Sequence, residues 1–218
     1  MNAKRTALHI VHGYNEPFLS LSNQYSRALQ SDGWRVITVY LSGAPDTAIR
    51  QKTIADEVIF FDASDKKMKG LKLGLMTRVS KLIQQHRVTL LIAQRYKPLY
   101  LALLGSVGSN IPVIGVAHAF GVLKNRARRC LLRLFQNRLL MVGVSEAVTQ
   151  DMQRCDTVLR KQALHNCIDS DVLETKLLPR MTAREKLALR DEEFVFANVG
   201  RLHDDKDQST LIRAFAHI

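Results

Sequence analysis

The sequence lacks several features that would place it in a restricted class. Only three cysteines occur in 218 residues, at Cys130, Cys155 and Cys167, and they show no metal-binding spacing. An odd number of such cysteines argues against a disulfide framework and indicates reduced thiols. No run of about 18 apolar residues is present, so no membrane-spanning helix is expected. We also expect no signal peptide, because the first residues lead directly into a strand-like run.

Acidic residues are missing from two basic stretches that hold much of the net charge of +12. Residues 66–81 and residues 124–138 contain many lysines and arginines but neither aspartate nor glutamate. Drawn as a helix, the second stretch places Ala127, Leu131 and Leu134 on one side and arginines on the other. Such a helix can lie on an anionic membrane surface, where each cation contributes about 1 kcal/mol.

These stretches leave three interpretations open. We expect peripheral contact with an anionic membrane surface through five cations: Lys69, Lys72, Arg126, Arg129 and Arg133. An ordinary helix that covers a sheet and has a solvated basic face would show the same apolar stripe. Nucleic acid is not an expected partner, because no aromatic-rich ribbon and no known binding module is visible.

Strand-like apolar runs alternate with helical patterns along most of the chain. Strands are expected at residues 7–12, 35–41, 57–61, 89–93, 112–117, 139–144 and 161–164, and helices at 19–30, 71–85, 98–104, from about 123, and at 145–152. This alternation predicts an α/β fold with a doubly wound, parallel, Rossmann-like sheet. A charged helical stretch at 181–190 ends the pattern, so we predict one domain at 1–190 and another at 191–218.

The C-terminal stretch has the pattern of a strand, a glycine turn and the start of a helix. Phe194–Val199 suits a buried strand, and Gln208 or Ser209 could cap the helix. Between them lie Arg201 and Lys206, at the position where open α/β sheets bind ligands. A guanidinium and an ammonium group together suit a phosphate. The same residues also fit an exposed loop whose cations are balanced by neighbouring aspartates.

The spacing Val-Gly-Arg-Leu-x3-Lys-x4-Leu-Ile-x-Ala-Phe at residues 199–215 resembles the start of the C-terminal domain of glycosyltransferase family 4, retaining enzymes of GT-B fold. Further similar landmarks are Gly-Trp-Arg-Val at 33–36, a strand that ends in His118, and Val-Ser at 144–145. Residues 164–169 are close to the family's Asn-Gly-Ile-Asp motif, with Cys167 in place of glycine. The resemblance implies a GT-B N-terminal domain followed by the truncated start of a second Rossmann-like domain.

The resemblance also implies roles for the donor site. The family's arginine and lysine hold the diphosphate of a nucleotide-sugar donor, which assigns this role to Arg201 and Lys206, with the Gly13 backbone beside them. After the first strand, however, this chain has one glycine where the family commonly has two. No metal and no other cofactor is expected, because cations and backbone donors would stabilise the leaving diphosphate.

His118 would be a catalytic residue that contacts the donor sugar or acceptor hydroxyls. Outside the family, a lone histidine after an apolar strand is more often a hydrogen-bonded structural residue. Acceptor binding would involve His12, Tyr14 and Arg95, of which Arg95 could meet an anionic acceptor or a phosphate. Ser145 is expected to cap a helix rather than to act as a nucleophile.

The complete enzyme would transfer a sugar from a nucleotide-sugar donor to a saccharide or lipid-linked acceptor, in bacterial cell-surface polysaccharide or lipopolysaccharide synthesis. We expect it to be cytoplasmic and peripheral at the inner face of the cell membrane. The family's Glu-x7-Glu element is expected beyond Ile218, so the 218-residue chain alone should be folded but inactive. The alternatives are another GT-B enzyme, such as a sugar-nucleotide epimerase, and a non-catalytic module that binds nucleotides or anionic surfaces.

Overall fold

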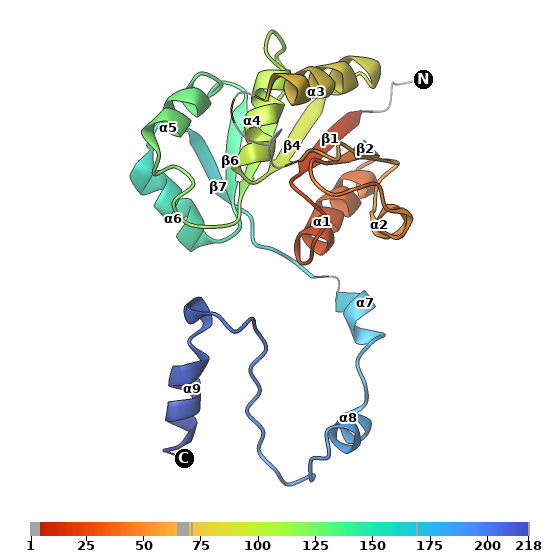
Figure 1. Cartoon of the computed structure of the whole chain (residues 1–218), viewed down its shortest axis with the longest axis vertical. Coiled ribbons are helices and arrows are strands. Elements are labelled where there is room, and N and C mark those ends of the chain that lie inside the picture. The colour runs from red at the N-terminus through yellow and green to blue at the C-terminus, as the bar shows by residue number, and fades with distance from the viewer. Residues whose placement is uncertain (1–4, 65–69, 71, 169, 218) are drawn as a thin grey trace. The chain divides into compact units, whose positions relative to one another are not determined.

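A computed structural model describes residues 5–64, 70, 72–168 and 170–217 of the chain, which divides into two compact units (Figure 1). The first unit is Met1–Asp169 and the second is Ser170–Ile218. Every strand of the described residues belongs to the first unit. The predicted domains at 1–190 and 191–218 stay a prediction, because the second unit contains residues of both.

The first unit is built on a seven-stranded sheet in which all neighbouring strands are parallel. The order is β3-β2-β1-β4-β5-β6-β7. The strands are β1 (Thr6–Val11), β2 (Arg35–Tyr40), β3 (Glu57–Phe60), β4 (Leu90–Gln94), β5 (Val113–Ala117), β6 (Leu139–Gly143) and β7 (Arg160–Ala163). Because the order changes direction between β1 and β4, the carboxyl ends of these two strands form the place where open α/β sheets bind ligands.

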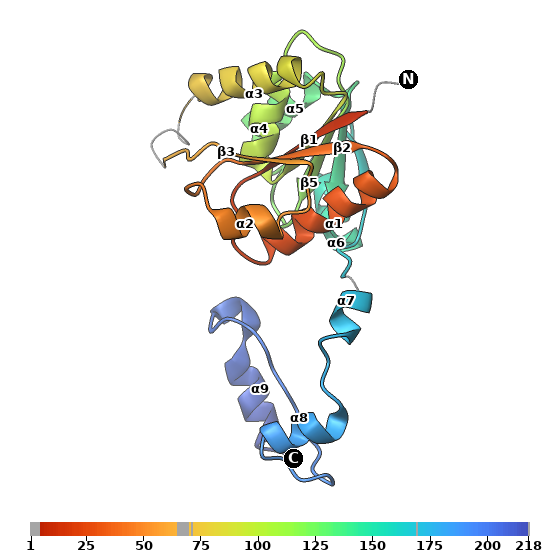
Figure 2. The same cartoon turned by 90° about the vertical axis from the view of Figure 1, so that its right-hand side faces the viewer.

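Helices cover both faces of this sheet (Figure 2). They are α1 (Phe18–Ser31), α2 (Thr47–Lys52), α3 (Leu73–Gln85), α4 (Tyr96–Gly105), α5 (Arg126–Arg133) and α6 (Glu146–Cys155). Side chains alternate along the strands, so Leu8 and Ile10 of β1 join the core shared with α3 and α4. Ala7 and Val11 belong to the opposite face, where α1 packs. The predicted doubly wound, parallel, Rossmann-like α/β fold is therefore confirmed.

Helix α5 turns a different side to the core than its sequence pattern predicts. Leu134, which was expected to face inward, is 78% exposed, whereas Leu132 is fully buried. The helix ends at Arg133, whose Nε donates a hydrogen bond to Asp156 Oδ2 at 2.7 Å. The Asp156 side chain is fully buried. Arg133 is itself 44% exposed, and its Nε supplies the partner that a buried carboxylate needs.

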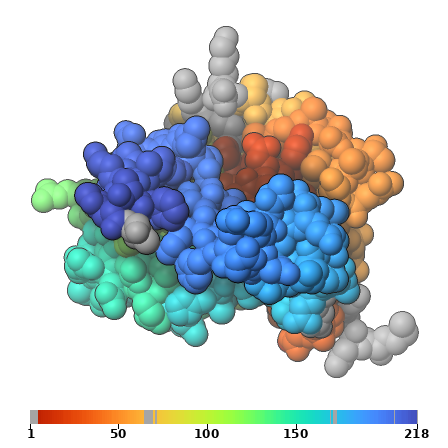
Figure 3. Space-filling view, turned by 90° about the horizontal axis from the view of Figure 1, so that it is seen from below, coloured from red at the N-terminus to blue at the C-terminus, as the bar shows by residue number. Residues whose placement is uncertain are grey.

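The second unit consists of short helices joined by irregular chain. They are α7 (Ser170–Glu174), α8 (Arg180–Lys186), the 3-10 turn η1 (Asp204–Lys206) and α9 (Gln208–Phe215). Figure 3 colours this unit light to dark blue. None of its described side chains is buried. The second unit thus has local structure but no core of its own among the described residues.

The predicted strand at Phe194–Val199 is wrong. These residues form no strand, and Val199 is 99% exposed. A strand needs a neighbour for its backbone hydrogen bonds, whereas a helix such as α9 satisfies most of its own. The predicted cap at Gln208 or Ser209 is also wrong, because the Asp207 side chain accepts the hydrogen bond from the Thr210 amide.

Candidate functional site

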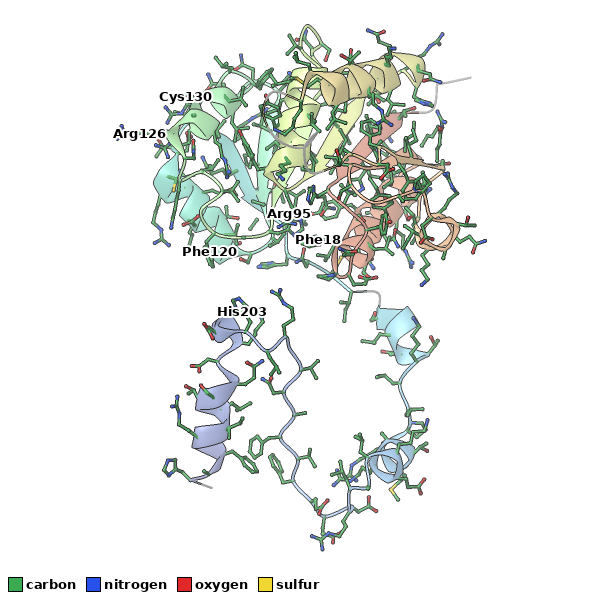
Figure 4. All side chains as sticks on the ribbon, viewed as in Figure 1. Phe18, Arg95, Phe120, Arg126, Cys130 and His203 are labelled. Carbon is green, nitrogen blue, oxygen red and sulfur yellow. The ribbon has the colours of Figure 1, made fainter. Side chains whose placement is uncertain are left out.

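Polar side chains gather at the carboxyl edge of the sheet in the first unit. His12 follows β1, Gln94 ends β4, and His118 follows β5. These three strands are neighbours in the sheet, in the order β1-β4-β5. Phe18, at the start of α1, and Arg95, directly after β4, lie at the same edge (Figure 4). The parallel topology thus brings together residues that are far apart in the sequence.

Gln94 is fully buried and bridges two histidines. Its amide nitrogen lies 3.0 Å from His9 Nε2, and its amide oxygen lies 2.8 Å from His118 Nε2. His9 Nδ1 lies 3.4 Å from Ser26 Oγ on α1. Because an amide oxygen only accepts, His118 Nε2 carries the proton and Nδ1 remains an acceptor. The network therefore fixes the tautomer and the orientation of the His118 ring.

Both histidines are neutral near neutral pH. Burial lowers the pKa of His9 to about 3, with the charge of His118 as a smaller cause. Burial also lowers the pKa of His118 to about 4, helped by the positive charge of Arg95. A neutral His118 is a poor acid at neutral pH, so its useful group is the Nδ1 acceptor. The hydrogen-bonded structural role and the predicted ligand-contacting role are thus compatible at His118.

Arg95 occupies a strained backbone conformation at the start of α4. Its φ of 77° and ψ of 169° lie in a region that non-glycine residues avoid, at a cost of order 1–3 kcal/mol. Its amide donates to the Val116 carbonyl at 2.9 Å, which ties this residue to β5. The guanidinium carbon lies 4.8 Å from the centre of the Phe18 ring, and that ring meets His118 edge-on at 5.6 Å. Strain of this kind is typical of functional sites.

A cavity of about 220 Å³ opens beside Arg95 at the N-terminus of α4. It is lined by His12, Arg95, Tyr96, Lys97, Pro98 and Arg128. The Arg128 guanidinium lies 4.2 Å from the centre of the Tyr96 ring, a cation–π contact. Three of the lining side chains are cationic and none is a carboxylate. The structure thus brings the predicted acceptor residues His12 and Arg95 into one cavity.

Tyr14, the third predicted acceptor residue, does not line this cavity. Its ring packs edge-on against Tyr40 at 5.5 Å and Phe60 at 5.9 Å, and its hydroxyl donates to the Ala44 carbonyl at 3.1 Å. The ring also lies against Gly43, where an added Cβ would come within 2.5 Å of it. Tyr14 therefore packs against the end of β2, and its acceptor role stays a prediction.

Gly13 lies close to the end of β2. A Cβ added at Gly13 would lie 3.0 Å from Ser42 Oγ, so a larger residue would fit only if its neighbour shifted. The carbonyl of His12, the residue before Gly13, accepts hydrogen bonds from the Ser42 amide at 2.9 Å and from the Ser42 hydroxyl at 2.7 Å. The turn after β1 is thus tightly held, as close approach of a backbone to a ligand would require. Binding of a donor diphosphate by Gly13 stays a prediction.

Arg201 and Lys206, the other predicted diphosphate residues, belong to the second unit. Both are exposed. The Lys206 side chain lies over Gly200, where a Cβ would be 3.7 Å from Lys206 Cγ. The Gln208 amide donates to the Arg201 carbonyl at 2.7 Å. These contacts hold Lys206 and Gln208 close to Gly200 and Arg201, and the role of Arg201 and Lys206 in donor binding stays a prediction.

Two arginines predicted to face a membrane bind within the first unit instead of pointing freely outward. Arg129 Nη1 donates to the carbonyls of Leu123, at 2.6 Å, and Lys124, at 2.9 Å. Arg133 pairs with Asp156, as described above. Both side chains therefore have structural partners, which the acid-free sequence of α5 did not suggest.

The remaining predicted membrane residues differ in their surroundings. Arg126 is exposed and points outward from α5 (Figure 4). Lys72 Nζ lies 4.7 Å from the centre of the Tyr100 ring, and burial together with the charge of Lys97 lowers the Lys72 pKa. Lys69 lies outside the described residues. Membrane contact through these residues stays a prediction.

The described part of the chain contains neither a candidate membrane-spanning helix nor a candidate metal cluster. No helix in the described part of the chain has both the length and the apolar character to cross a membrane. Within the same described residues, no group of three or more histidine, cysteine, aspartate or glutamate side chains is placed to hold a metal ion. The prediction that no metal or other cofactor is needed stays a prediction.

Sequence reasoning missed several residues of this site. It did not identify Phe18, Lys97 and Arg128 as parts of the site, and it gave Gln94 no role as a bridge. A signal existed for Gln94, because a polar residue that ends an apolar strand faces the ligand edge of the sheet. No local signal marked Arg128, because it comes from a helix whose placement depends on the whole sheet.

The predicted cap at Ser145 is confirmed, since its hydroxyl accepts a hydrogen bond from the Val148 amide at 3.2 Å.

Residues 23–172 match the family model described as Glycosyltransferase Family 4, which is more than half of the chain. No curated protein matches the sequence. Solved structures share its fold at low sequence identity. A glycosyltransferase from Rickettsia africae ESF-5 is 14% identical, with a TM-score of 0.65 over 87% of this chain and 51% of that one.

Two other solved structures extend the comparison. Sucrose-phosphate synthase from Thermosynechococcus elongatus is 15% identical, with a TM-score of 0.70 over 99% of this chain and 60% of that one. UDP-N-acetylglucosamine 2-epimerase from Rickettsia bellii is 11% identical, with a TM-score of 0.53 over 86% of this chain and 52% of that one. At these identities the likeness shows the fold alone. The chain spans about half to three fifths of the length of these proteins.

Proposed function

Because this chain belongs to glycosyltransferase family 4, we propose that it forms the acceptor-binding part of a retaining enzyme that takes its sugar from a nucleotide-sugar donor. The acceptor would be a saccharide or a lipid-linked saccharide. The observation that carries the proposal is the polar site at the carboxyl ends of β1, β4 and β5, where His118 presents an oriented acceptor nitrogen. The family match supports transfer over other reactions that use the same fold.

In this proposal His118 acts by orienting a hydroxyl group. Its neutral Nδ1 accepts a hydrogen bond from a sugar hydroxyl, while the bond from Nε2 to Gln94 holds the ring in place. The backbone of Gly13, with Arg201 and Lys206, stabilises the diphosphate as negative charge develops on the leaving oxygen. Since these groups supply the charge stabilisation, the proposed reaction needs no metal ion.

Saccharide binding tests the acceptor role. We would titrate the chain with a panel of neutral oligosaccharides and phosphorylated saccharides, and follow its amide and His118 ring signals by NMR. His118→Ala should weaken binding of any hit by about tenfold, which is the effect of losing one well-placed hydrogen bond. Arg154→Gln, which changes an exposed residue of α6, is the control. If His118→Ala binds the hits as tightly as the control, the proposed role of His118 is wrong.

Release of nucleoside diphosphate tests the reaction itself. The chain alone is expected to release none from a panel of nucleotide sugars, because Arg201 and Lys206 would be only part of the donor site. Turnover by the chain would contradict this expectation. Calorimetry with nucleoside diphosphates on a longer protein that contains both domains would separate an enzyme from a non-catalytic surface module, which should bind no nucleotide.

One second candidate has a specific observation in its favour. UDP-N-acetylglucosamine 2-epimerases share the fold of the first unit, so a sugar-nucleotide epimerase is a natural alternative. The two reactions leave different products. Transfer joins the sugar to an acceptor, whereas epimerisation changes the sugar without any acceptor, and NMR of the product mixture distinguishes them.

We also propose a cellular location and a pathway for the enzyme. The enzyme would act in the cytoplasm, at the inner face of the membrane, in the synthesis of cell-surface polysaccharide or lipopolysaccharide. The exposed Arg126 on α5 supports contact with anionic lipid. Co-sedimentation with anionic vesicles should exceed that with neutral vesicles and should fall in Arg126→Gln. Equal sedimentation with both vesicle types would contradict membrane contact.

A further inference from the structure

The cavity at the start of α4 has an unusual balance of charge. Arg95, Lys97 and Arg128 line it from two helices and the loop before α4. Among the described residues, none of these three cations forms an ion pair with a carboxylate. Elsewhere in the first unit, Arg5, Arg35 and Arg133 each have an acidic partner. Cations gathered without a counter-charge repel one another and favour an anion between them.

Two of the three cations stack on aromatic rings, although Arg95 and Lys97 are exposed. The Arg128 guanidinium stacks on Tyr96 at 4.2 Å, and Tyr96 lies 6.4 Å from Tyr100, measured between ring centres. Arg95 is placed by its strained backbone and by its contact with Phe18. An arginine that is already oriented loses less entropy when it forms a two-pronged contact with an anion.

The start of α4 adds to this positive potential. Helix α4 is 10 residues long, and its first residues, Tyr96 and Lys97, line the cavity. Amides in the first turn of a helix have no partner within the helix and favour negative charge. Pro98, the third residue, has no amide hydrogen. The cavity therefore combines arginine forks, an ammonium group and helix amides, which are the groups that recognise phosphate in proteins.

We propose that this cavity binds a phosphate group carried by the acceptor. The proposal rests on the proposed function, because it names the chemical class of the acceptor at the same edge of the sheet. A phosphomonoester offers three acceptor oxygens that share a charge of about −1.5 to −2, which matches three cations better than a carboxylate with two oxygens and one charge. His12 and the nearby His118 then lie where the sugar part of the same molecule would extend.

Binding of defined phosphates to the chain tests the proposal without any transfer reaction. The probes are inorganic phosphate, a hexose 6-phosphate, the neutral hexose, and vesicles of phosphatidylcholine with or without phosphatidic acid. Calorimetry measures the soluble probes and co-sedimentation measures the vesicles. The soluble and vesicle arms separate a free sugar phosphate from a lipid headgroup as the source of the phosphate.

Matched variants locate the binding. Arg128→Gln and Lys97→Gln each remove one cation from the cavity, and Arg154→Gln removes one exposed cation of α6. Lys97 is exposed, so Lys97→Gln provides a cavity variant that folds even if Arg128→Gln does not. We expect each cavity variant to weaken phosphate binding by about tenfold. Arg154→Gln should leave it within about twofold, and added salt should weaken binding in the wild type.

Each outcome decides the proposal. Selective binding of hexose 6-phosphate over hexose, lost in the cavity variants, supports it with a soluble acceptor. Binding only to phosphatidic acid vesicles, lost in the same variants, supports it with a lipid headgroup as the source. No preference for phosphate, or equal losses in Arg154→Gln, overturns it. If the chain binds phosphate but the complete enzyme transfers no saccharide, the phosphate site is supported and only the proposed function is contradicted.

Discussion

Both units contain apolar runs of residues, but these residues are buried in the first unit and exposed in the second. In the first, Leu8 and Leu91 lie in adjacent strands and are completely buried. In the second, Phe194 and Val199 come from a run that is just as apolar, yet they are 84% and 99% exposed. The difference lies in the neighbours. Burial requires a second layer of structure, and the helices of the first unit provide one. In the second unit the Phe196 ring meets Phe215 of α9 at 5.6 Å, yet none of the described side chains of that unit is buried.

In the second unit a helix forms without burial, whereas the apolar run that was predicted to be a strand does not form one. Helix α9 forms in the second unit although none of its side chains is buried, because its backbone hydrogen bonds are local and Asp207 caps its first turn. The run at Phe194–Val199 forms no strand, because no other strand lies beside it. Four measurements test this difference between the two units.

Hydrogen exchange should show the largest difference. Amides of β1 and β4 should exchange only by global unfolding, which corresponds to about 5–15 kcal/mol of protection. Amides of Phe194–Val199 should show protection near zero, because they make no strand hydrogen bonds. NMR or mass spectrometry can measure both sets in one sample. Strong protection at Phe194–Val199 would mean that the second unit pairs with something in solution.

Removing the same side chain from each unit should have unequal effects. Leu91→Ala should lower the free energy of unfolding by about 2–5 kcal/mol, because Leu91 is fully buried in β4. Leu202→Ala should change it by less than about 0.5 kcal/mol, because Leu202 is 93% exposed. Urea unfolding followed by circular dichroism measures both variants. Comparable losses would show that the second unit has a core.

A matched pair of aspartates provides the third test. Asp156→Asn should cost about 1–3 kcal/mol, because the buried carboxylate accepts from the Val158 and Leu159 amides and from Arg133. Asp207→Asn should have little effect, because asparagine caps helices about as well as aspartate. Thermal unfolding compares the two variants with the wild type. The contrast fails if Asp207→Asn is the more damaging change.

Acid should act on the first unit through its buried histidines. The folded-state pKa values of His118, about 4, and His9, about 3, lie below the usual 6.5, so the unfolded chain binds more protons between about pH 4 and 6.5. Stability should therefore be full above pH 6.5 and fall as the pH drops toward 4, by about 1.4 kcal/mol per pH unit for each such proton.

The variant His118→Asn should reduce this slope by the contribution of about one proton. Urea unfolding at several pH values gives the slope. An unchanged slope in His118→Asn would show that burial and the charge of Arg95 do not hold His118 neutral in the folded state.

Much of the first unit was predictable because its signals are local. Apolar runs located the seven strands, and Ser145 was recognised as a cap from its position before a helix. The side of α5 that faces the core was not predictable, because Leu132 is buried in a core made of residues far along the chain. The strand at Phe194–Val199 was predicted from its own composition, which carries no information about neighbours.

The site divides in the same way. The positions of His12, Arg95 and His118 after apolar strands can be read from the sequence, because strand composition and polar strand ends are local properties. The link from His9 through Gln94 to His118, and the meeting of Arg128 with Arg95 and Lys97 at one cavity, depend on the folded arrangement. The physical reason is the parallel sheet: its strand order sets which ends are neighbours, and that order follows from how the helices pack across the whole unit.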